Sequence, residues 1–268
     1  MADDDGGSAR RYHERTKHSL ASLRSGPHGL DWANQPLPFK TYQGVPGEEL
    51  PRAFAPSGTS AREAIRGRAA SRRDAQFPNR AALARLLFFS LGIVRRRELA
   101  DGRRIFFRAA PCTGALYHVD AYLIAAELPD LAAGVYHFGA HDFSLRRLRA
   151  GDWRGVLVEA SGGEARIADA PATLVLASTY WRNAWKYRAR AYRHVFWDGG
   201  TALAQLFAQA NADGWPVALV LGFTDATVER LCGLDPAREG VVALVPVGER
   251  GAAAARPAPH VPPLDLPT

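Results

Sequence analysis

Residues 181–223 constrain the fold more than any other stretch, because they join an aromatic, cation-rich segment to an apolar segment typical of a helix followed by a strand. In the first part, Lys186, Arg190 and Arg193 have the spacing that places three side chains on one face of a helix. Three cations on one face repel one another unless an anion lies among them. We therefore expect this part to bind an anionic group or to carry chemistry.

The second part of the stretch predicts a separate helix over 198–214 and then a buried strand over 216–223. Asp198 is the expected N-cap of this helix, and Gly214 is the expected stop signal. The predicted apolar stripe consists of Leu203, Leu206, Phe207 and Ala210. Such a stripe is typical of a helix that packs in a core or at a dimer contact.

Helices and strands alternate along the chain, which predicts an α/β or α+β class with strands buried between helices. We expect helices over 8–23 and 152–160, from Asp225 through 231, and after an N-cap at Asn79, with the stripe Leu83, Leu86, Leu87 and Leu91. The predicted strands are 103–108, 121–126, 173–177 and 240–247, with a hairpin over 134–148. Residues 27–56 contain six prolines and predict an extended arm, either a strap on its own domain or a lid over a partner subunit. The Ala- and Pro-rich stretch after 251 predicts a loose or domain-straddling tail.

The net charge of +7, from 34 basic and 27 acidic residues, raises the question of a nucleic-acid partner. The arginines are scattered, however, and no zinc-finger, RRM or KH motif is present, so we expect no nucleic acid. The acidic start and the lack of an apolar run long enough to span a bilayer predict a cytoplasmic protein with no membrane contact. Two cysteines, Cys112 and Cys232, are too few for a disulfide framework and indicate a reducing compartment.

Histidine spacing does not predict a metal site. The segment HERTKH resembles the zinc-binding HExxH motif but has one residue too many, which moves the second histidine off the helix face of the first. His137 and His141 flank the predicted hairpin turn at metal-like spacing, and we expect both to be exposed turn residues.

Two polar segments have residue types that suit a phosphorylated, planar ligand. The Ser-Arg-Arg triplet at 71–73 offers a hydroxyl beside two guanidinium groups, although such triplets are also common on solvated surfaces. The Pro-Cys-Thr-Gly turn at 111–114 is tight enough for backbone amides to face a planar ring at close range.

Lys186 is one of only three lysines in the chain, with Lys17 and Lys40. An arginine could supply charge, but only a lysine can release a proton near neutral pH. We expect the neighbouring arginines to favour the neutral amine that a general base needs. By composition alone, the more ordinary role of such a lysine is an ion pair with a carboxylate on a helix surface.

Four blocks in a fixed order resemble one enzyme family. They are YHERTKHSL with LDWANQPLPFKTY, then PCTGALYHVDAYL, then WRNAWKYRARAYRHVFWDGGTAL, and last LVLGFTDATVERLCGLDPAREGVVALVPVG. Together they are similar to the FMN-dependent nitroreductase family, in its branch of SagB-type dehydrogenases from thiazole and oxazole peptide biosynthesis. The resemblance implies an α+β, nitroreductase-like fold with a central, mostly antiparallel sheet flanked by helices. It also implies a homodimer with swapped extensions and FMN bound near the dimer interface.

The resemblance assigns roles to individual residues. The residues that match FMN-binding positions are Ser71, Arg72, Arg73, Pro111, Thr113, Gly114, Leu221, Gly222, Phe223 and Arg250. Lys186 and Tyr187 match the pair that this branch is thought to use for proton transfer. The chain departs from the family pattern at Cys112, where serine is usual, at His118, where proline is usual, and at Ala69, where arginine is usual.

The implied activity is oxidation of an azoline ring to an azole, with hydride transfer to FMN N5. Two other functions fit the same residues: an NAD(P)H-dependent nitro or quinone reductase, and a flavin-free binding subunit of a peptide-modifying complex. The absence of a Rossmann motif does not separate them, because reductases of this fold bind nicotinamide without one. We expect an arm over 1–60, an FMN-binding domain over 61–250 and a tail over 251–268.

Overall fold

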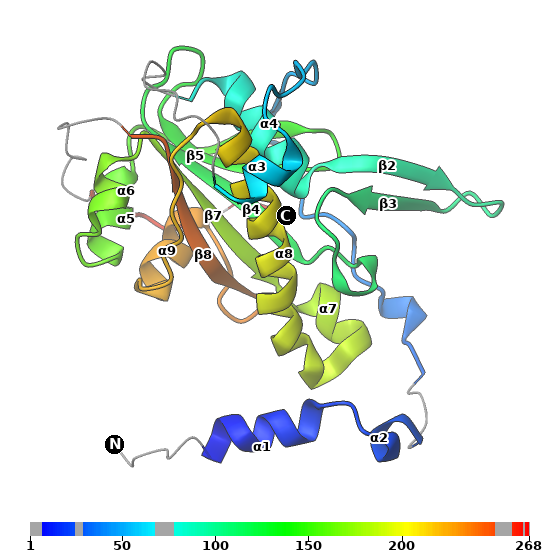
Figure 1. The fold of residues 1–268 in the computed structure, drawn as a ribbon. Helices are drawn as coiled ribbons and strands as arrows, with labels where there is room; N and C mark the ends of the chain where they lie inside the picture. Colours follow the sequence, from blue (N-terminus) through cyan, green and yellow to red (C-terminus); the bar gives the residue numbers. More distant parts are fainter. Residues whose placement is uncertain (1–6, 25–28, 68–77, 250–258, 265, 268) are drawn as a thin grey trace.

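The computed structural model describes residues 7–24, 29–67, 78–249, 259–264, 266 and 267 (Figure 1). The predicted phosphate-binding residues Ser71, Arg72, Arg73 and Arg250 lie outside this part of the chain. No helix within it is both long enough and apolar enough to cross a bilayer.

A six-stranded sheet forms the centre of the fold. Its order is β1-β6-β5-β4-β7-β8, and each neighbouring pair runs antiparallel. The strands are β1 (Gly47–Glu49), β4 (Val119–Ala125), β5 (Gly134–Gly139), β6 (Ser144–Ala150), β7 (Ala172–Thr179) and β8 (Glu239–Val247). The predicted α+β class, with an antiparallel sheet flanked by helices, is confirmed.

Helices cover both faces of this sheet, with α4 (Arg80–Leu91) and α8 (Ala191–Asp213) on one face and α5 (Arg154–Ala160) and α9 (Asp225–Cys232) on the other (Figure 1). The other helices of the described residues are α1 (Gly7–Thr16), α2 (Leu20–Arg24), α3 (Ala61–Ile65), α6 (Ala165–Asp169) and α7 (Tyr180–Tyr187), and α1 and α2 lie away from the sheet. Short 3-10 turns lie at Trp32–Asn34, Thr113–Ala115 and Arg188–Arg190.

Strand β4 shows how one strand serves two apolar cores. Side chains alternate across a strand, so Leu123 packs with α4 and α8 on one face, while Tyr122 and Ile124 pack with α5 and α9 on the other. Every residue of β4, β5 and most of β7 is buried, as expected for central strands covered on both faces. Helix α4 begins as predicted, with the Asn79 side chain accepting a hydrogen bond from the Ala82 N–H at 2.8 Å.

The cation-rich segment is two helices and not one. Helix α7 ends at Tyr187, where Arg188 takes a left-handed φ of +50°, and α8 begins only after the 3-10 turn at 188–190. Lys186 therefore lies on a different helix from Arg190 and Arg193, and the predicted shared face does not exist. Helix α8 runs through Asp198 without interruption, so Asp198 is not an N-cap. Gly214 does end the helix as predicted, with a φ of +75°.

Residues 216–223 form an extended segment beside β8, and the prediction of a buried strand was wrong. Only isolated bridges join the segment to β8, at Val217 with Val247 and at Val220 with Leu244. Val220 is buried, whereas Leu221 is 65% exposed. The segment therefore presents its last residues at the surface.

A two-stranded ribbon extends away from the body of the molecule (Figure 1). It pairs β2 (Ile93–Glu98) with β3 (Arg104–Arg108), and only β3 was predicted. The arginine run at 95–97 hides the alternation by which a strand is recognised in sequence. Gly102, with a φ of +79°, makes the turn between the strands possible.

The terminal segments are more ordered than expected where the structure describes them. The predicted helix over 8–23 is divided into α1 and α2, because Ser19 caps the second helix by accepting from the Ser22 N–H at 3.1 Å. In the tail, Val261 and Leu264 pack against the core beside α9, so this part is not loose. Gln43 in the arm donates its backbone N–H to the Pro267 carbonyl at 2.8 Å.

Candidate active site

A tight turn after β3 is held by one carboxylate on α8. Asp198 Oδ2 accepts from the Thr113 backbone N–H at 3.0 Å and from Cys112 Sγ at 3.1 Å, while Oδ1 accepts from Thr113 Oγ1 at 2.8 Å. His118 Nε2 lies 2.9 Å from the same Oδ2. Only 6% of Asp198 is exposed. By accepting hydrogen bonds from these four donors, the carboxylate holds the turn against α8.

This network continues into the sheet through His118. Its Nδ1 lies 2.8 Å from Ser178 Oγ on β7, and its ring is fully buried. The sulfur, imidazole and carboxylate atoms of Cys112, His118 and Asp198 lie within 4.8 Å of one another. That spacing would suit one metal ion, but the hydrogen bonds between these groups already use the same atoms.

The network changes the acidity of two of its members. Burial alone would raise the pKa of Asp198, but hydrogen bonds from His118, Cys112 and Thr113 lower it below its usual value. For Cys112, burial and the adjacent Asp198 carboxylate raise the pKa to about 12. A thiolate is the reactive form of cysteine, so Cys112 serves here as a neutral hydrogen-bond donor and not as a nucleophile.

Tyr187, the last residue of α7, packs between this turn and α8. A β-carbon built on Gly114 would lie 2.6 Å from the Tyr187 hydroxyl oxygen, so only glycine fits beside it. His194 contacts the Tyr187 ring edge-on at a centroid distance of 4.7 Å, and its Nδ1 lies 2.7 Å from Asn183 Oδ1. Lys186 Nζ lies 5.5 Å from the centroid of the Tyr187 ring. Both predicted catalytic residues, Lys186 and Tyr187, therefore lie beside the turn that is predicted to contact the flavin.

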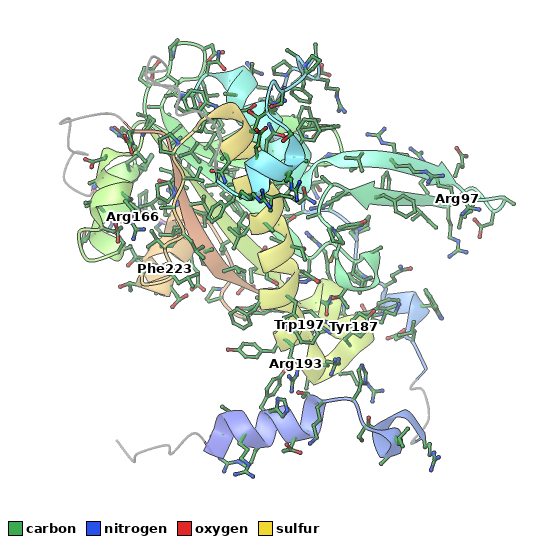
Figure 2. The ribbon with its side chains drawn as sticks, in the orientation of Figure 1. Arg97, Arg166, Tyr187, Arg193, Trp197 and Phe223 are labelled. Carbon is green, nitrogen blue, oxygen red and sulfur yellow. The ribbon has the colours of Figure 1, made fainter. Side chains whose placement is uncertain are left out.

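The arginines expected to surround an anion bind the end of α1. Arg193 donates to the His13 carbonyl at 2.9 Å and to Thr16 Oγ1 at 2.8 Å, and Arg190 donates to the Thr16 carbonyl. The last carbonyls of a helix carry a partial negative charge, which takes the place of the expected anion. Figure 2 shows Arg193 directed toward α1, with Tyr187 and Trp197 above it.

An apolar cavity of about 580 Å³ lies between α7, α8, β8 and the segment that follows Val220. Leu221 and Phe223 line it on one side, and Tyr192 and Phe196 of α8 line it on the other. Asn183 also lines the cavity, and its buried Nδ2 makes no hydrogen bond to any described residue. The wall is therefore largely apolar, a composition that suits a planar organic ligand.

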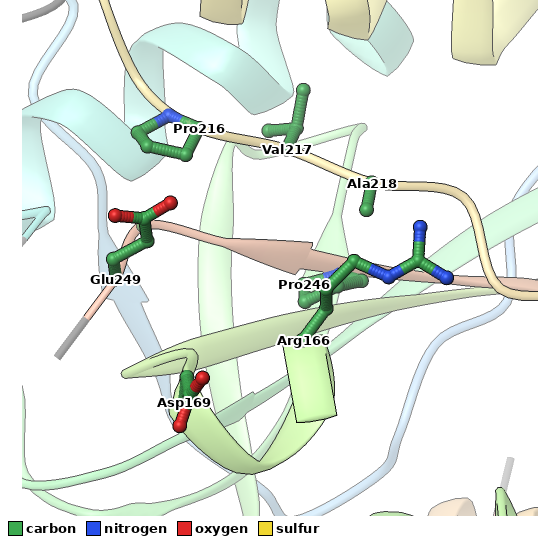
Figure 3. Close-up of a pocket in the computed structure, with 8 residues that line it drawn as sticks. Arg166, Asp169, Pro216, Val217, Ala218, Pro246 and Glu249 are labelled. Atoms are coloured by element: carbon green, nitrogen blue, oxygen red, sulfur yellow. The ribbon is translucent and has the colours of Figure 1, made fainter. Parts of the chain in front are cut away.

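A second, smaller cavity of about 230 Å³ lies at the other end of the segment 216–223 (Figure 3). Its wall includes Arg166 and the carboxylates of Asp169 and Glu249. Beside it, a β-carbon on Gly248 would come within 3.2 Å of Pro78 Cδ. The residues that flank 68–77 and 250–258 are therefore in contact.

Comparisons with known proteins identify the family of the chain. The model of the Nitroreductase family matches residues 74–249, which is more than half of the chain. The chain belongs to the nitroreductase family. A nitroreductase-family protein of Methanocaldococcus jannaschii is 24% identical over 168 residues, which are 63% of this chain and 79% of that protein.

Solved structures resemble this chain over most of its length. A nitroreductase-family protein of Anabaena variabilis has a TM-score of 0.73 and 28% identity, and the match covers 95% of this chain but 52% of that one. The chain thus spans about half the length of the Anabaena protein. The microcin synthetase McbBCD complex of E. coli, with truncated pro-MccB17 bound, has a TM-score of 0.55 at 20% identity, covering 89% and 86% of the two chains. At that identity the likeness is one of fold.

The predicted site residues that the structure describes lie in two groups. Thr113 and Gly114 lie with Tyr187 and Lys186, and the carbonyl of Pro111 is held by Thr201 Oγ1 of α8 at 2.7 Å. The second group, Leu221, Gly222 and Phe223, lies at the apolar cavity, where a β-carbon on Gly222 would meet nothing within 4 Å. Helix α7 contributes to both groups, through Asn183 to the cavity and through Tyr187 to the turn.

Sequence reasoning missed the parts of the site that depend on distant contacts. Asp198 was seen only as a cap, and Asn183 was not singled out. A polar residue inside an otherwise apolar helix, as at Asp198, is the signal that could have indicated a buried partner.

The expectation for the hairpin histidines was wrong at His137. It is 1% exposed, and its ring contacts Tyr42 and Tyr122 with centroid distances of 5.1 Å. Burial lowers the pKa of His137 to about 3. His141 is half-buried beside Phe39 and not fully exposed.

Proposed function

We propose that this member of the nitroreductase family is an FMN-dependent dehydrogenase of the SagB type, which oxidises an azoline ring to an azole. The observation that carries the proposal is the placement of Lys186 and Tyr187 beside the Gly114 turn. Lys186, as the base for the ring proton, would then lie beside a turn whose backbone amides could face a flavin. The two cysteines of the chain are free thiols, which accords with the cytoplasmic location we propose.

The residues present fit FMN. The large cavity is mostly apolar, as the flavin ring requires, and the unused Asn183 Nδ2 could donate to a ring oxygen. The open space at Gly222 lets its backbone approach a ring edge. The smaller cavity is less suitable, because Asp169 and Glu249 would repel the phosphate.

The phosphate would be held by residues 71–73 and Arg250. Support comes from described residues near them in the sequence, since a β-carbon on Gly248 would lie 3.2 Å from Pro78 Cδ. A serine hydroxyl and three guanidinium groups are the donors that a phosphate binds. When bound, FMN would supply the two-electron acceptor that takes a hydride from the ring.

The chain supplies the other half of the reaction. An azoline becomes an azole when one ring carbon loses a proton, its neighbour loses a hydride, and a double bond forms between them. Lys186 Nζ would take the proton. The Tyr187 ring, 5.5 Å from Nζ, would stabilise the ammonium group so formed. His194 and Asn183 position the Tyr187 ring through the edge contact and the 2.7 Å hydrogen bond.

We further propose a homodimer with swapped extensions that packs through the α7–α8 region. Its exposed aromatic residues are Tyr180, Trp181, Tyr192, Phe196 and Trp197, which are 41–61% exposed. A contiguous apolar surface of this kind marks an interaction site. A second copy placed on this surface would cover the open side of the cavity. The fold shared with the microcin synthetase complex makes a peptide-modifying assembly the natural setting of such a dimer.

The test is Lys186→Ala, with Lys17→Ala at the exposed residue that follows α1 as the matched control. We expect the Lys186 variant to keep its flavin absorbance and lose turnover of a thiazoline substrate by about 10²-fold or more. Lys186→Arg should be equally inactive, because an arginine keeps the charge but cannot release the proton. If Lys186→Ala oxidises the thiazoline at the normal rate, the assignment of the base is wrong.

An NAD(P)H-dependent nitro or quinone reductase is the second candidate, because the Methanocaldococcus relative is named as a nitroreductase. Rapid reduction of the bound flavin by NADH or NADPH in stopped flow, without azoline turnover, would establish it. The third candidate, a flavin-free binding subunit, requires a purified protein that is colourless and does not take up FMN.

A further inference from the structure

The β2–β3 ribbon has two different faces. Residues opposite each other in an antiparallel pair lie on one face, so Arg95 and Arg97 share a face with Phe107 and Ile105. The other face contains Phe106, which contacts Phe39 of the arm at a centroid distance of 5.0 Å. The face with Arg95 and Arg97 is therefore the one directed away from the body.

The ribbon is strongly basic, with exposed arginines at 95, 96, 97, 103 and 104. Arg95 and Arg97 lie on the outer face, whereas Arg96 lies on the face of Phe106 and donates to the His141 carbonyl at 3.0 Å. The ribbon carries two acidic residues, Glu98 and Asp101, and Asp101 is already paired with Arg103 at 2.7 Å. Apolar surface lies among the charges, because Val94 is 50% and Phe107 is 36% exposed. Figure 2 shows Arg97 toward the outer end of the ribbon.

The ribbon also has a free backbone edge. Among the described residues it is a two-stranded sheet, so each strand has one neighbour there and its outer edge has no described strand partner. An extended peptide can add to such an edge through main-chain hydrogen bonds. Side chains two apart in that peptide would lie on one face, in register with Arg95 and Arg97.

We propose that the outer edge of β2 binds an extended acidic peptide segment with carboxylates at alternating positions. Arg95 and Arg97 pair with two carboxylates on the outer face, while the side chains between those carboxylates point to the opposite face. β3 leads through Ala109 directly into the turn at 111–114, so a peptide bound on the ribbon is anchored next to the candidate active site. This inference extends the proposed function by naming the part of a peptide substrate that the chain binds, but its test needs neither FMN nor turnover.

Charged residues also protect exposed strand edges from aggregation. Protection of an edge does not depend on the sign of the side-chain charge, because glutamate protects an edge as well as arginine does. Binding of an acidic peptide depends on sign. The two roles can therefore be separated by reversing the charges while leaving the number of charges unchanged.

The experiment measures fluorescence anisotropy of a fluorescein-labelled peptide of alternating glutamate and valine. We expect the full-length protein to bind it, with affinity that falls as salt rises. Arg95→Gln/Arg97→Gln should weaken binding by about tenfold, since two exposed ion pairs are lost. The control Arg10→Gln/Arg15→Gln removes the same charge from exposed α1 and should leave binding unchanged.

The charge-reversal variant Arg95→Glu/Arg97→Glu decides the matter. It should lose the glutamate peptide and gain binding of the equivalent lysine peptide, with its circular dichroism spectrum unchanged. Equal binding by the protein and both ribbon variants would overturn the proposal. Tighter, ribbon-dependent binding of duplex DNA or RNA than of the acidic peptide would also overturn it. Failure of the Lys186 test would leave this result standing, because no step of the binding assay involves Lys186.

Discussion

The hydroxyl oxygen of Tyr187 occupies the space into which a β-carbon on Gly114 would project, at a separation of 2.6 Å. Gly114 has a φ of +66°, in the left-handed region that favours glycine. The turn and the end of α7 are therefore fitted to each other in both backbone conformation and volume.

Substitution Gly114→Ala should harm the site more than the fold. The backbone penalty is about 1–2 kcal/mol, and the added methyl group must also displace Tyr187. The matched control is Gly162→Ala, since Gly162 has a φ of +67° and open space around it. We expect both variants to melt at a lower temperature, while only Gly114→Ala loses turnover. Equal turnover in the two variants would contradict the role of this contact.

Asp198→Asn should release the turn from α8. The asparagine keeps the shape of the side chain but directs an NH₂ group at donors, so buried hydrogen bonds are lost at a cost of about 2 kcal/mol or more. The pKa of Asp198 is lower in the folded state than in the unfolded state. Its ionised carboxylate therefore stabilises the fold at pH values above the unfolded-state pKa, and this stabilisation is lost as pH falls through the folded-state pKa.

The difference in unfolding free energy between the parent protein and Asp198→Asn should therefore shrink below about pH 4. Urea titrations at several pH values measure it. Exposed Asp169→Asn serves as the control and should show little difference at any pH. A constant difference down to pH 2 would exclude the ionised carboxylate as its source.

His137 should make the protein sensitive to mild acid. Its pKa is about 3 in the folded state and near 6.5 when unfolded, so below pH 6.5 the unfolded chain binds a proton that the folded chain does not. Stability is lost as pH falls through this interval. His137→Phe should remove this effect. The unfolding free energy of His137→Phe minus that of the parent protein should be larger at pH 5 than at pH 8 by about 2 kcal/mol. Exposed His260→Phe should show no such change, and neither should His137→Phe if the imidazole is protonated when folded.

Arg193→Met should loosen α1 from α8. Two hydrogen bonds to the last turn of α1 are lost, at His13 and Thr16. Amide hydrogen exchange in α1 should become faster by about tenfold, given the usual strength of a charged hydrogen bond. Arg188→Met, at an exposed position between α7 and α8, provides the comparison and should leave exchange in α1 unchanged. Unaltered exchange in both variants would show that other contacts hold the helix.

Local signals in the sequence were sufficient to predict several helices and strands. Asn79 caps α4 with a hydrogen bond three residues away, and apolar runs identified β4, β7 and β8 before any partner strand was known. The resemblance to the nitroreductase family added the paired arrangement of Lys186 and Tyr187.

What the sequence could not show depends on groups far apart in the chain. Asp198 receives its donors from residues 80 or more positions earlier, so its cap-like context was misleading. His137 is buried between Tyr42 of the arm and Tyr122 of β4, both distant in the sequence. The break at Arg188 requires a left-handed backbone in a residue with no glycine-like signal, and tertiary contacts impose it.

The hydrogen bond between Gln43 and the Pro267 carbonyl has a consequence for synthesis. Residue 43 leaves the ribosome long before residue 267, so this contact cannot form until residue 267 has emerged. Until then the arm lacks this contact with the tail. Nascent chains halted before residue 267 emerges should therefore expose the arm to protease, and chains halted after it has emerged should protect it.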